Sequence, residues 1–279
     1  MPTRILLVRH GATALTAEDR FAGSSDVPLS DEGRMQIASL AERLAGVPVV
    51  AVYASPLQRT METARILSEP HALQIQSESA LREIDYGRWE GLTRNQVEEH
   101  YADEYAMWEE DPLIIAPEGG ESGINVVNRV LPVMRRIVGR HRHQTVLVVS
   151  HKGTNRLLVS SLLGFDMRSY RERLDQSPAA LTILDFMNEV RPRLRLFNDV
   201  SHYEDYPQRV LAERLSKWWR PTLGVWAERR SDSLERDASD FTNEPAQCLP
   251  APAGRISIRN PSSRIATGMG LSGSCRCLQ

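Results

Sequence analysis

The sequence predicts an α/β protein with three layers, in which helices cover both faces of a mixed, mostly parallel sheet. Short apolar runs such as Ile5–Val8 are too short to cross a membrane and have the right length for buried parallel strands. Longer stretches with helical spacing of apolar residues separate them, and helical connections favour parallel pairing. The predicted order is β-α-β-α-β-α-α-β-α-β-β, followed by a poorly ordered C-terminal tail.

The first predicted strand ends in Arg9-His10-Gly11. An α/β sheet places its chemistry at the carboxyl ends of strands, so this strand delivers a cation and an imidazole to the expected site. One such triplet alone is most often only a strand end with two polar residues. A loop is predicted at 14–29, after which Ser30 marks the N-cap of a helix that ends at Gly46-Val47-Pro48.

A second buried strand is predicted at Val49–Ala54, and the helix after it places Arg59 near the strand's carboxyl end. Ser55 is the expected N-cap of this helix, with Pro56 at the first helical position and Gln58 completing a capping box. Arg59 then lies in the first helical turn. An anion there would meet both the free backbone N–H groups and the guanidinium.

The middle of the chain predicts one short edge strand and several helices. The expected elements are a strand at 74–76, a loop with a glycine hinge at Leu81–Gly91, a helix opened by the capping box Thr93-x-x-Gln96, a helix at Ala102–Glu110 that continues it or lies beside it, and a long helix from Ser122 to Arg140. Pro132 predicts a kink or a break within the long helix.

The third buried strand, Thr145–Ser150, ends at His151 and brings a second imidazole to the same sheet edge. Thr154 is the expected cap of the helix at 155–163. Strands at Ala180–Phe186 and Arg193–Phe197 are predicted to pair. Residues 1–206 then form one domain. Residues 207–279 form an extension with one amphipathic helix at 211–223 and otherwise the composition of a disordered segment.

Composition narrows the classes of function. With 279 residues, 41% of them hydrophobic and 25% charged, the chain is typical of a globular protein. A net charge of −2 without a basic stripe argues against nucleic-acid binding, and no apolar run is long enough for a membrane span. No signal peptide is recognised, so we expect a cytoplasmic protein, and a homodimer stays open. The core lacks a cysteine nucleophile, because all three cysteines lie in the tail: Cys248, Cys275 and Cys277.

The strand-end residues Arg9, His10, Arg59 and His151 suit chemistry on a phosphate monoester. Two arginines can hold the phosphate through forked hydrogen bonds. One histidine can attack phosphorus, and the other can stabilise charge on a non-bridging oxygen. Departure of the leaving group needs a proton donor, and none of these roles needs a metal or another cofactor. The residues alone leave the donor open among four carboxyl groups: Glu83, Asp85, Glu90 and Glu121.

Six motifs in register resemble the histidine phosphatase superfamily, in its phosphoglycerate-mutase-like branch. They are Arg9-His10-Gly11-Ala12-Thr13, Asp26-x-Pro28-Leu29-Ser30-x-x-Gly33, Ser55-Pro56-Leu57-x-Arg59-Thr60-x-x-Thr63-Ala64, Glu83-x-x-x-Gly87-x-Trp89-Glu90-Gly91, Pro117-x-Gly119-Gly120-Glu121-Ser122 and Ser150-His151. They cover roughly residues 4–203. The resemblance implies that His10 is the phosphorylated nucleophile, that Arg9, Arg59 and His151 form the phosphate pocket, and that Glu83 is the proton donor. The other three carboxylates are then expected in salt bridges, in caps or on the surface.

The chain departs from the family pattern at a few positions that bear on the substrate. Thr16 stands where many members have an asparagine that contacts phosphate, and its hydroxyl can still donate. Lys152 stands where glycine is usual, and it either meets a second anionic group of the substrate or is solvated. Ala12 and Ala22 replace residues with longer polar side chains.

The leading prediction is a phosphatase that hydrolyses a small-molecule phosphomonoester through a phosphohistidine. The first alternative is a cofactor-dependent phosphoglycerate mutase, which in this superfamily carries a longer insert than the segment between Gly91 and Ser122. The second is a non-catalytic protein that binds a phospho-ligand, which predicts a missing pocket residue. His141-x-His143 resembles a metal pair, but no nearby carboxylate or cysteine cluster completes a site.

Overall fold

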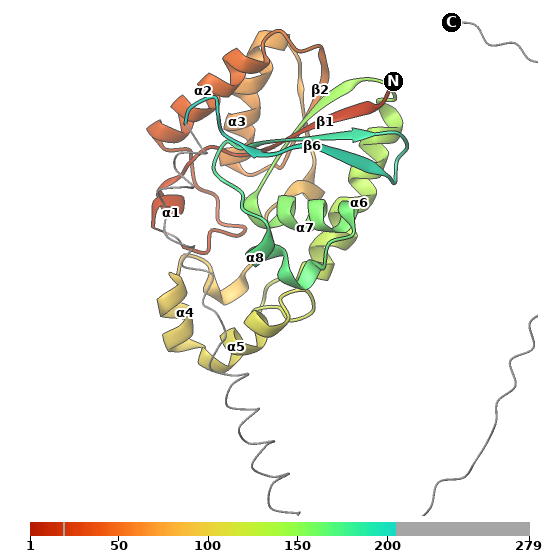
Figure 1. The fold of residues 1–279 in the computed structure, drawn as a ribbon. Helices are drawn as coiled ribbons and strands as arrows, with labels where there is room; N and C mark the ends of the chain where they lie inside the picture. Colours follow the sequence, from red (N-terminus) through yellow and green to blue (C-terminus); the bar gives the residue numbers. More distant parts are fainter. Residues whose placement is uncertain (19, 205–279) are drawn as a thin grey trace, which may run out of the picture. The chain divides into compact units, whose positions relative to one another are not determined.

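The computed structural model describes residues 1–18 and 20–204. The predicted extension at 207–279, with its helix at 211–223, lies outside these described residues. Within them, one six-stranded sheet carries helices on both faces (Figure 1). No helix among the described residues is long and apolar enough to cross a membrane.

The sheet is mixed and mostly parallel, as predicted. Its strands are β1 (Thr3–Arg9), β2 (Val49–Ala54), β3 (Ile75–Ser77), β4 (Thr145–Ser150), β5 (Leu181–Phe186) and β6 (Pro192–Asp199). Their spatial order is β3-β2-β4-β1-β5-β6. The first four strands are parallel, whereas β5 runs antiparallel to β1 and β6 antiparallel to β5.

Alternation along the central strand β1 builds two cores, because successive side chains point to opposite faces of a sheet. Ile5 and Leu7 pack in a core with the buried faces of α6 (Gly123–Arg140) and α7 (Lys152–Leu163). Leu6 and Val8 pack on the other side with α2 (Asp31–Leu44) and α3 (Gln58–Ser68). These four consecutive side chains are at most 2% exposed, which explains why this part of β1 is apolar without a break.

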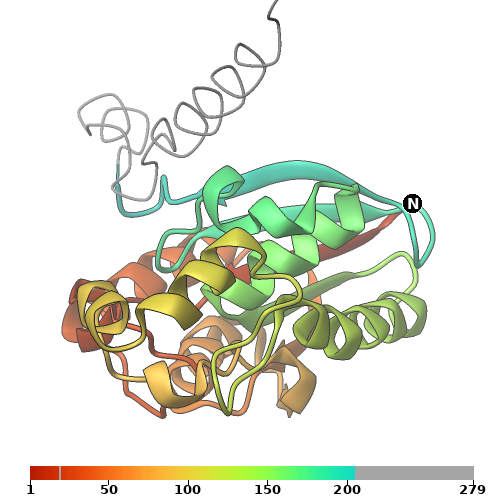
Figure 2. The same ribbon diagram turned by 90° about the horizontal axis from the view of Figure 1, so that it is seen from below.

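The remaining α-helices among the described residues are short, and the first and the last of them were not expected from the sequence. They are α1 (Ala14–Ala17), α4 (Arg94–His100), α5 (Ala102–Glu110) and α8 (Tyr170–Arg173). The predicted loop at 14–29 therefore begins with one helical turn, and α5 is separate from α4. In both views α4 and α5, drawn in yellow, lie at the end of the fold opposite the N-terminus (Figure 2). A separate aromatic cluster that includes Phe21, Trp89 and Trp108 packs there.

Several predicted helix starts are confirmed by their caps. The hydroxyl of Ser30 accepts a hydrogen bond from the backbone of Gly33 at the start of α2. Thr93 and Ser122 each form a capping box, at the starts of α4 and α6. However, α6 runs through Pro132 without a break. Its long buried face holds the helix together although the proline cannot donate to the preceding turn.

Two predicted caps are wrong, and both corrections concern the site. Helix α3 begins at Gln58 with Leu57 in the cap position and no side-chain cap bond. The Ser55 hydroxyl lies 2.8 Å from Nε2 of His151 and accepts from the backbone N–H of Leu57 at 3.4 Å, just before the helix. Helix α7 begins at Lys152 with His151 in the cap position, so Thr154 lies within the first turn rather than before it.

Candidate active site

The carboxyl ends of β1, β2 and β4 meet at one edge of the sheet. In the strand register, Arg9 lies beside Ser150 and Ala54 beside Val149. The residues that follow each strand therefore gather in one place, and the rings of His10 and His151 lie 5.2 Å apart between centroids in an edge-to-face arrangement. The two histidines predicted from separate strands are neighbours.

The backbone fixes how His10 presents its ring. Its Nδ1 lies 2.7 Å from the carbonyl oxygen of Gly11. A carbonyl only accepts, so Nδ1 carries the proton in this contact and Nε2 keeps its lone pair. The pKa of His10 lies well below its ordinary value of 6.5, first because the ring is buried and then because Arg59 and Arg9 are close. The ring is therefore neutral near pH 7 and has a nucleophilic nitrogen available.

His151 is fully buried and is held by a different partner. Its Nε2 lies 2.8 Å from the hydroxyl oxygen of Ser55. Burial lowers its pKa well below 6.5, and Arg59 and His10 lower it further. Its Nδ1 has no hydrogen-bond partner among the described residues, so this nitrogen is available to a substrate oxygen.

Arg9 and Arg59 are buried cations with most of their donors unused. A guanidinium has five N–H donors. Among the described residues, Arg9 donates one of them, to the carbonyl oxygen of Gln176 at 2.6 Å. Arg59 donates two, to the carbonyl oxygens of Ser25 at 2.6 Å and Gly23 at 2.8 Å. Burial lowers the pKa of both arginines, that of Arg9 to about 10, yet both stay charged near pH 7. The remaining donors suit a phosphate with two negative charges.

The loop that accepts from Arg59 is itself held by Glu90. The carboxylate of Glu90 accepts from the backbone N–H of Ser24 at 2.6 Å and from the hydroxyls of Ser24 and Ser25. Gly23 has a positive φ of 39°, and a Cβ there would lie 2.1 Å from the Glu90 carboxylate. The expectation that Glu90 has a structural role is therefore confirmed, since it shapes the turn that orients Arg59.

Glu83 lies against the N-terminal turn of α7. Its Oε1 accepts from the backbone N–H groups of Ile84 at 3.0 Å and Thr154 at 2.9 Å, and its Oε2 accepts from that of Gly153 at 2.9 Å. The side chain belongs to a residue only 8% exposed. Because α7 begins next to His151, the helix places Glu83 beside the pocket, and Oε2 keeps more free acceptor capacity than Oε1.

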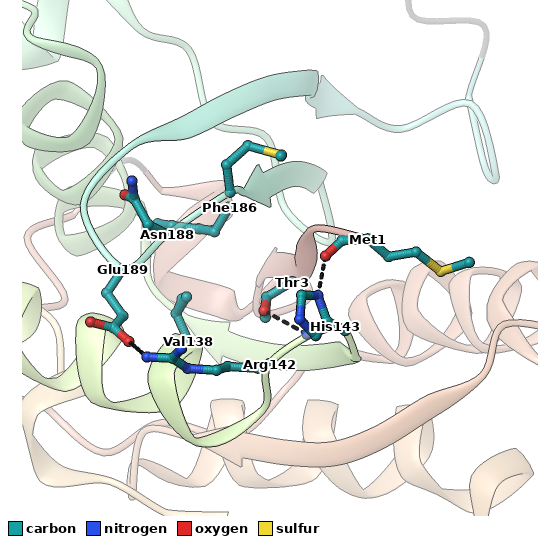
Figure 3. Close-up of a pocket in the computed structure, with 9 residues that line it drawn as sticks. Met1, Thr3, Val138, Arg142, His143, Phe186, Asn188 and Glu189 are labelled. Atoms are coloured by element: carbon teal, nitrogen blue, oxygen red, sulfur yellow. Dashed lines mark hydrogen bonds and ion pairs between the residues drawn. The ribbon is translucent and has the colours of Figure 1, made fainter.

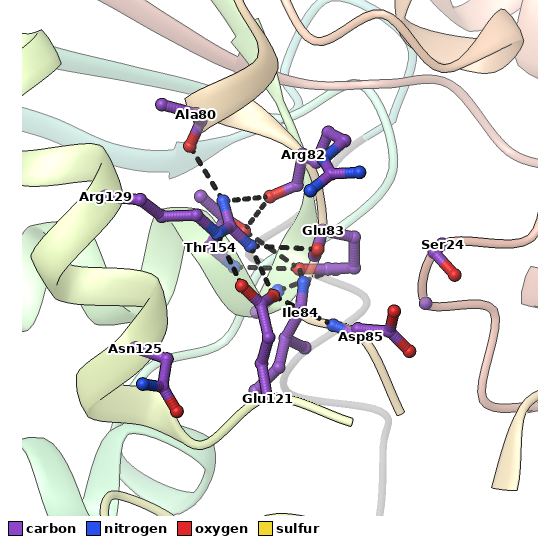
Figure 4. Close-up of polar contacts among 12 residues, drawn as sticks. Ser24, Ala80, Arg82, Glu83, Ile84, Asp85, Glu121, Asn125, Arg129 and Thr154 are labelled. Carbon is purple, nitrogen blue, oxygen red and sulfur yellow. Dashed lines mark hydrogen bonds and ion pairs between the residues drawn. The ribbon is translucent and has the colours of Figure 1, made fainter. Parts of the chain in front are cut away.

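Arg129 of α6 and Glu121 form a brace behind Glu83 (Figure 4). All five donors of Arg129 are used. Three reach the carbonyl oxygens of Ala80, Arg82 and Glu83 at 2.7–3.0 Å, and two reach the carboxylate of Glu121. Burial works to raise the pKa of Glu121, but the bonds from Arg129 outweigh it and the pKa lies below its ordinary value. The salt bridge expected for Glu121 is confirmed.

The two residues predicted to touch substrate at the rim have their own contacts. The hydroxyl of Thr16 lies 3.0 Å from that of Thr13, with which it forms the capping box of α1. Lys152 is the first residue of α7 and is half-buried. Lys152 directly follows His151, and the contact of both residues with substrate stays a prediction. Asp85 accepts from the backbone N–H of Gly87 at 2.8 Å.

Sequence reasoning missed the partners that orient the predicted residues. Ser55 was expected as a helix cap and instead contacts His151. The contacts of Arg129 with the segment before Glu83 have no local signal in the sequence, because the two are separated by more than forty positions. The motif Ser55-Pro56 at a strand end is the only signal that placed one of these partners near the pocket.

A hollow of about 150 Å³ lies at the opposite end of β1 from the pocket, around the first residues of that strand (Figure 3). Its polar groups are paired with each other: Arg142 with Glu189 at 2.6 Å, and the backbone N–H of His143 with the Thr3 hydroxyl at 3.0 Å. His141 bonds the Tyr53 hydroxyl at 3.0 Å. No group of three or more potential metal ligands is present among the described residues.

Comparison with known proteins agrees with this geometry. The model of the histidine phosphatase superfamily (branch 1) matches residues 5–200. Phosphoserine phosphatase 1 of Hydrogenobacter thermophilus is 35% identical over 167 residues, which is 60% of this chain and 79% of that protein. The mycobacterial glucosyl-3-phosphoglycerate phosphatase, solved as a complex with VO3, superposes with a TM-score of 0.64 at 30% identity and covers 70% of this chain and 98% of its own.

A bifunctional protein of Mycobacterium tuberculosis is 36% identical over 205 residues. These are 72% of this chain and 55% of that protein, so the chain spans about half the length of that relative. Its further activities are therefore not carried over.

The chain belongs to the histidine phosphatase superfamily. It is a phosphatase that acts on small phosphate esters, as its phosphatase relatives and the matched structure do. The prediction of the fold and of a small-molecule phosphomonoesterase is thereby confirmed.

Proposed function

We propose that this phosphatase works through a phosphohistidine on His10, with Arg9, Arg59 and His151 binding the phosphate and Glu83 handling protons. The observation that supports the proposal most is the state of the His10 ring. Its Nδ1 donates to the Gly11 carbonyl, its Nε2 makes no hydrogen bond with the described residues, and burial lowers its pKa. A neutral imidazole held in this way is an activated nucleophile.

In the first step, Nε2 of His10 forms a bond to phosphorus while the bond from phosphorus to the ester oxygen breaks. A proton held on Glu83 moves to the departing oxygen, so that an alcohol leaves. The unused donors of Arg9 and Arg59, with Nδ1 of His151, stabilise charge on the non-bridging oxygens. Because these donors are already placed, the site does not reorganise during the reaction.

In the second step, water attacks phosphorus and the bond to Nε2 of His10 breaks. The carboxylate of Glu83 takes the proton of that water, which returns Glu83 to its protonated state for the next cycle. The products are an alcohol and inorganic phosphate. We assign the proton transfer to Oε2 of Glu83, since Oε1 already accepts from the N–H groups of Ile84 and Thr154.

The covalent intermediate gives the direct test. Enzyme that is quenched during turnover of a labelled phosphate ester should yield a phosphopeptide containing His10 that is labile in acid and stable in base. His10→Ala should lose both the label and turnover, whereas His100→Ala, which changes an exposed histidine on α4, should keep both. A label on serine, or normal turnover by His10→Ala, would contradict the proposal.

The names of the relatives narrow the substrate only to a small organic phosphate ester and do not identify the alcohol that leaves. Two of them are named for phosphoserine and for glucosyl-3-phosphoglycerate. We propose substrates of this size, and a screen over a panel of phosphorylated metabolites that measures released phosphate tests it. Activity only on phosphoproteins, or release of an isomerised ester in place of phosphate, would contradict this choice.

A further inference from the structure

Arg156, on α7, is a largely buried cation near the pocket that differs from Arg9 and Arg59 in its contacts. Its side chain is only 11% exposed, and its nearest carboxylate, Asp175, lies 3.6 Å away, beyond hydrogen-bond distance. Its Nε has no hydrogen-bond partner among the described residues. Arg156 is therefore ion-paired with the exposed Asp175 but has no acceptor at hydrogen-bond distance among the described residues, although a guanidinium largely removed from water normally makes hydrogen bonds.

Arg156 lies next to the phosphate pocket through the segment 175–176. Gln176 accepts from Arg9 through its carbonyl oxygen at 2.6 Å, and the preceding residue, Asp175, faces Arg156. After burial, the charge of Arg156 is the largest influence that lowers the pKa of Arg9. The charges of the two guanidinium groups are therefore close enough to interact.

Neutral polar groups are placed around the same point. The amide of Gln176 belongs to a residue only 1% exposed, and neither its nitrogen nor its oxygen has a partner among the described residues. The phenols of Tyr86 and Tyr170 lie within electrostatic range of Arg156, and burial raises the pKa of Tyr170 to about 12. Both phenols are therefore neutral near pH 7 and can donate or accept.

We infer that Arg156, with the Gln176 amide beside it, forms a subsite for the leaving group and selects phosphate esters whose alcohol carries a carboxylate. The inference rests on the proposed phosphatase mechanism. A guanidinium binds a carboxylate through two parallel hydrogen bonds. The phosphate already has two cations, Arg9 and Arg59, for its two charges. One further cation matches one further negative charge, which a carboxylate supplies.

In this subsite, the bound substrate supplies the hydrogen-bond partners that Arg156 and the Gln176 amide lack among the described residues. The carboxylate takes the donors of Arg156, and a neighbouring hydroxyl or amine on the alcohol meets the amide of Gln176. Binding energy from this remote group then holds the ester oxygen in place for reaction. An ester that lacks the carboxylate leaves the guanidinium donors without an acceptor at hydrogen-bond distance, which is how a polar subsite rejects an incomplete substrate.

The test compares two esters that differ only in the carboxylate, O-phosphoserine and O-phosphoethanolamine. Wild-type enzyme should have a kcat/KM for O-phosphoserine about 10- to 100-fold higher, the range expected for hydrogen bonds to a charged group. Arg156→Met should reduce that ratio to near one. Arg156→Lys keeps the charge without the fork and should give an intermediate ratio. Arg65→Met, an exposed arginine on α3, is the matched control and should leave the ratio unchanged.

The outcomes separate the inference from the mechanism on which it rests. Wild-type enzyme without preference between the two esters, or Arg156→Met with the full preference, would overturn the subsite. If Arg156→Met does not fold, the kcat/KM ratios of wild type and Arg156→Lys test the subsite. An unchanged ratio in Arg156→Lys would then overturn it. If wild-type enzyme cleaves neither these esters nor p-nitrophenyl phosphate, the mechanism fails instead. Calorimetric binding of O-phosphoserine against O-phosphoethanolamine then still tests the subsite.

Discussion

The phosphate pocket and the brace behind it both depend on arginine, but they use it in opposite ways. In the brace, Arg129 donates all five of its N–H groups to neighbouring oxygens. In the pocket, Arg9 donates one and Arg59 two among the described residues. The brace residue is a finished structural element. The pocket residues keep donors free at the cost of burying charge without full pairing.

This difference shows how the protein divides stability from function. A saturated, partly buried arginine fixes the backbone of 80–83, and breaking it leaves oxygens and a carboxylate unpaired. An unsaturated arginine contributes less to the fold and more to binding an anion. Glu83 lies at the boundary, because its carbonyl belongs to the brace and its carboxylate to the pocket. Substitutions on the two sides should therefore separate activity from stability.

The largest expected effect is that of Glu83→Gln, which changes the pocket side of the boundary. Hydrolysis of an alkyl phosphate should fall about 10²- to 10⁴-fold, the usual cost of losing general acid–base catalysis. Phosphorylation of His10 by p-nitrophenyl phosphate should fall far less, because nitrophenolate leaves without a proton. Phosphoenzyme should then accumulate, since water is no longer activated. Rapid-quench kinetics on both esters measure this, with the exposed Glu69→Gln as control. Equal losses on both esters without accumulation would assign the proton to another group.

The next largest effect separates Arg59 from Arg129. Arg59→Met should lower kcat/KM by about 10²- to 10³-fold, as for the loss of a donor to transition-state charge. Arg129→Met should instead destabilise the fold by about 2 kcal/mol, because Glu121 and three carbonyls lose their donor. Its turnover of alkyl phosphates should drop about tenfold through a less fixed Glu83.

Denaturant unfolding and steady-state kinetics of both variants make this comparison. Arg136→Met, an exposed arginine on the same helix as Arg129, is the matched control and should change neither quantity. If Arg129→Met retains full stability, the brace has no structural importance. If Arg59→Met loses stability but no activity, the division drawn between the two arginines is wrong.

The folded protein should become less stable as pH is lowered, because of the two pocket histidines. Their folded pKa values lie well below 6.5, first through burial, so the folded protein leaves them neutral where the unfolded chain protonates them. As pH falls below about 6.5, the unfolded state binds more protons and Tm should drop. Saturating inorganic phosphate should reduce the drop, since an anion favours the protonated rings. The Tm of His10→Gln should depend less on pH, because one of the two histidines is gone. A wild-type Tm that stays constant between pH 7 and 5, while that of His10→Gln changes, would contradict this assignment.

A smaller effect is expected for Ser55→Ala, which removes the partner of His151 Nε2. The ring loses one hydrogen bond and with it a fixed orientation, so kcat should fall about 3- to 10-fold. Its pH profile should also shift, whereas a purely structural role would change Tm alone. Ser39→Ala, which removes an exposed hydroxyl on α2, is the matched control. Restoration of kcat by Ser55→Thr would support a positioning role for the hydroxyl.

The smallest effect is expected from chelation. The pocket supplies its positive charge from Arg9 and Arg59, and in the proposed mechanism these guanidinium groups take the role that a divalent ion has elsewhere. Activity should therefore stay unchanged in EDTA. A loss of activity that is reversed by adding a divalent ion would show that the pocket needs a metal ion in addition to its arginines.

The sequence by itself determined the sheet, the two histidines and the arginines of the pocket. Buried strands are visible as short apolar runs, and the rule that chemistry follows the carboxyl ends of parallel strands brings Arg9, His10 and His151 together. These signals are local, because each depends on a strand and the few residues after it. The proton donor was reachable only through the resemblance to a family, since four carboxylates were equivalent in sequence.

Only the tertiary structure decided which side chains serve which partner. Ser55 bonds a histidine rather than a helix end, and Arg129 reaches the segment before Glu83 from a helix far along the chain. Arg156 looks like any helical arginine in sequence, and only the fold shows that it is largely buried without a hydrogen bond to the described part of the chain. Donor saturation is a property of space, because it depends on oxygens contributed by distant segments, and no local pattern records it.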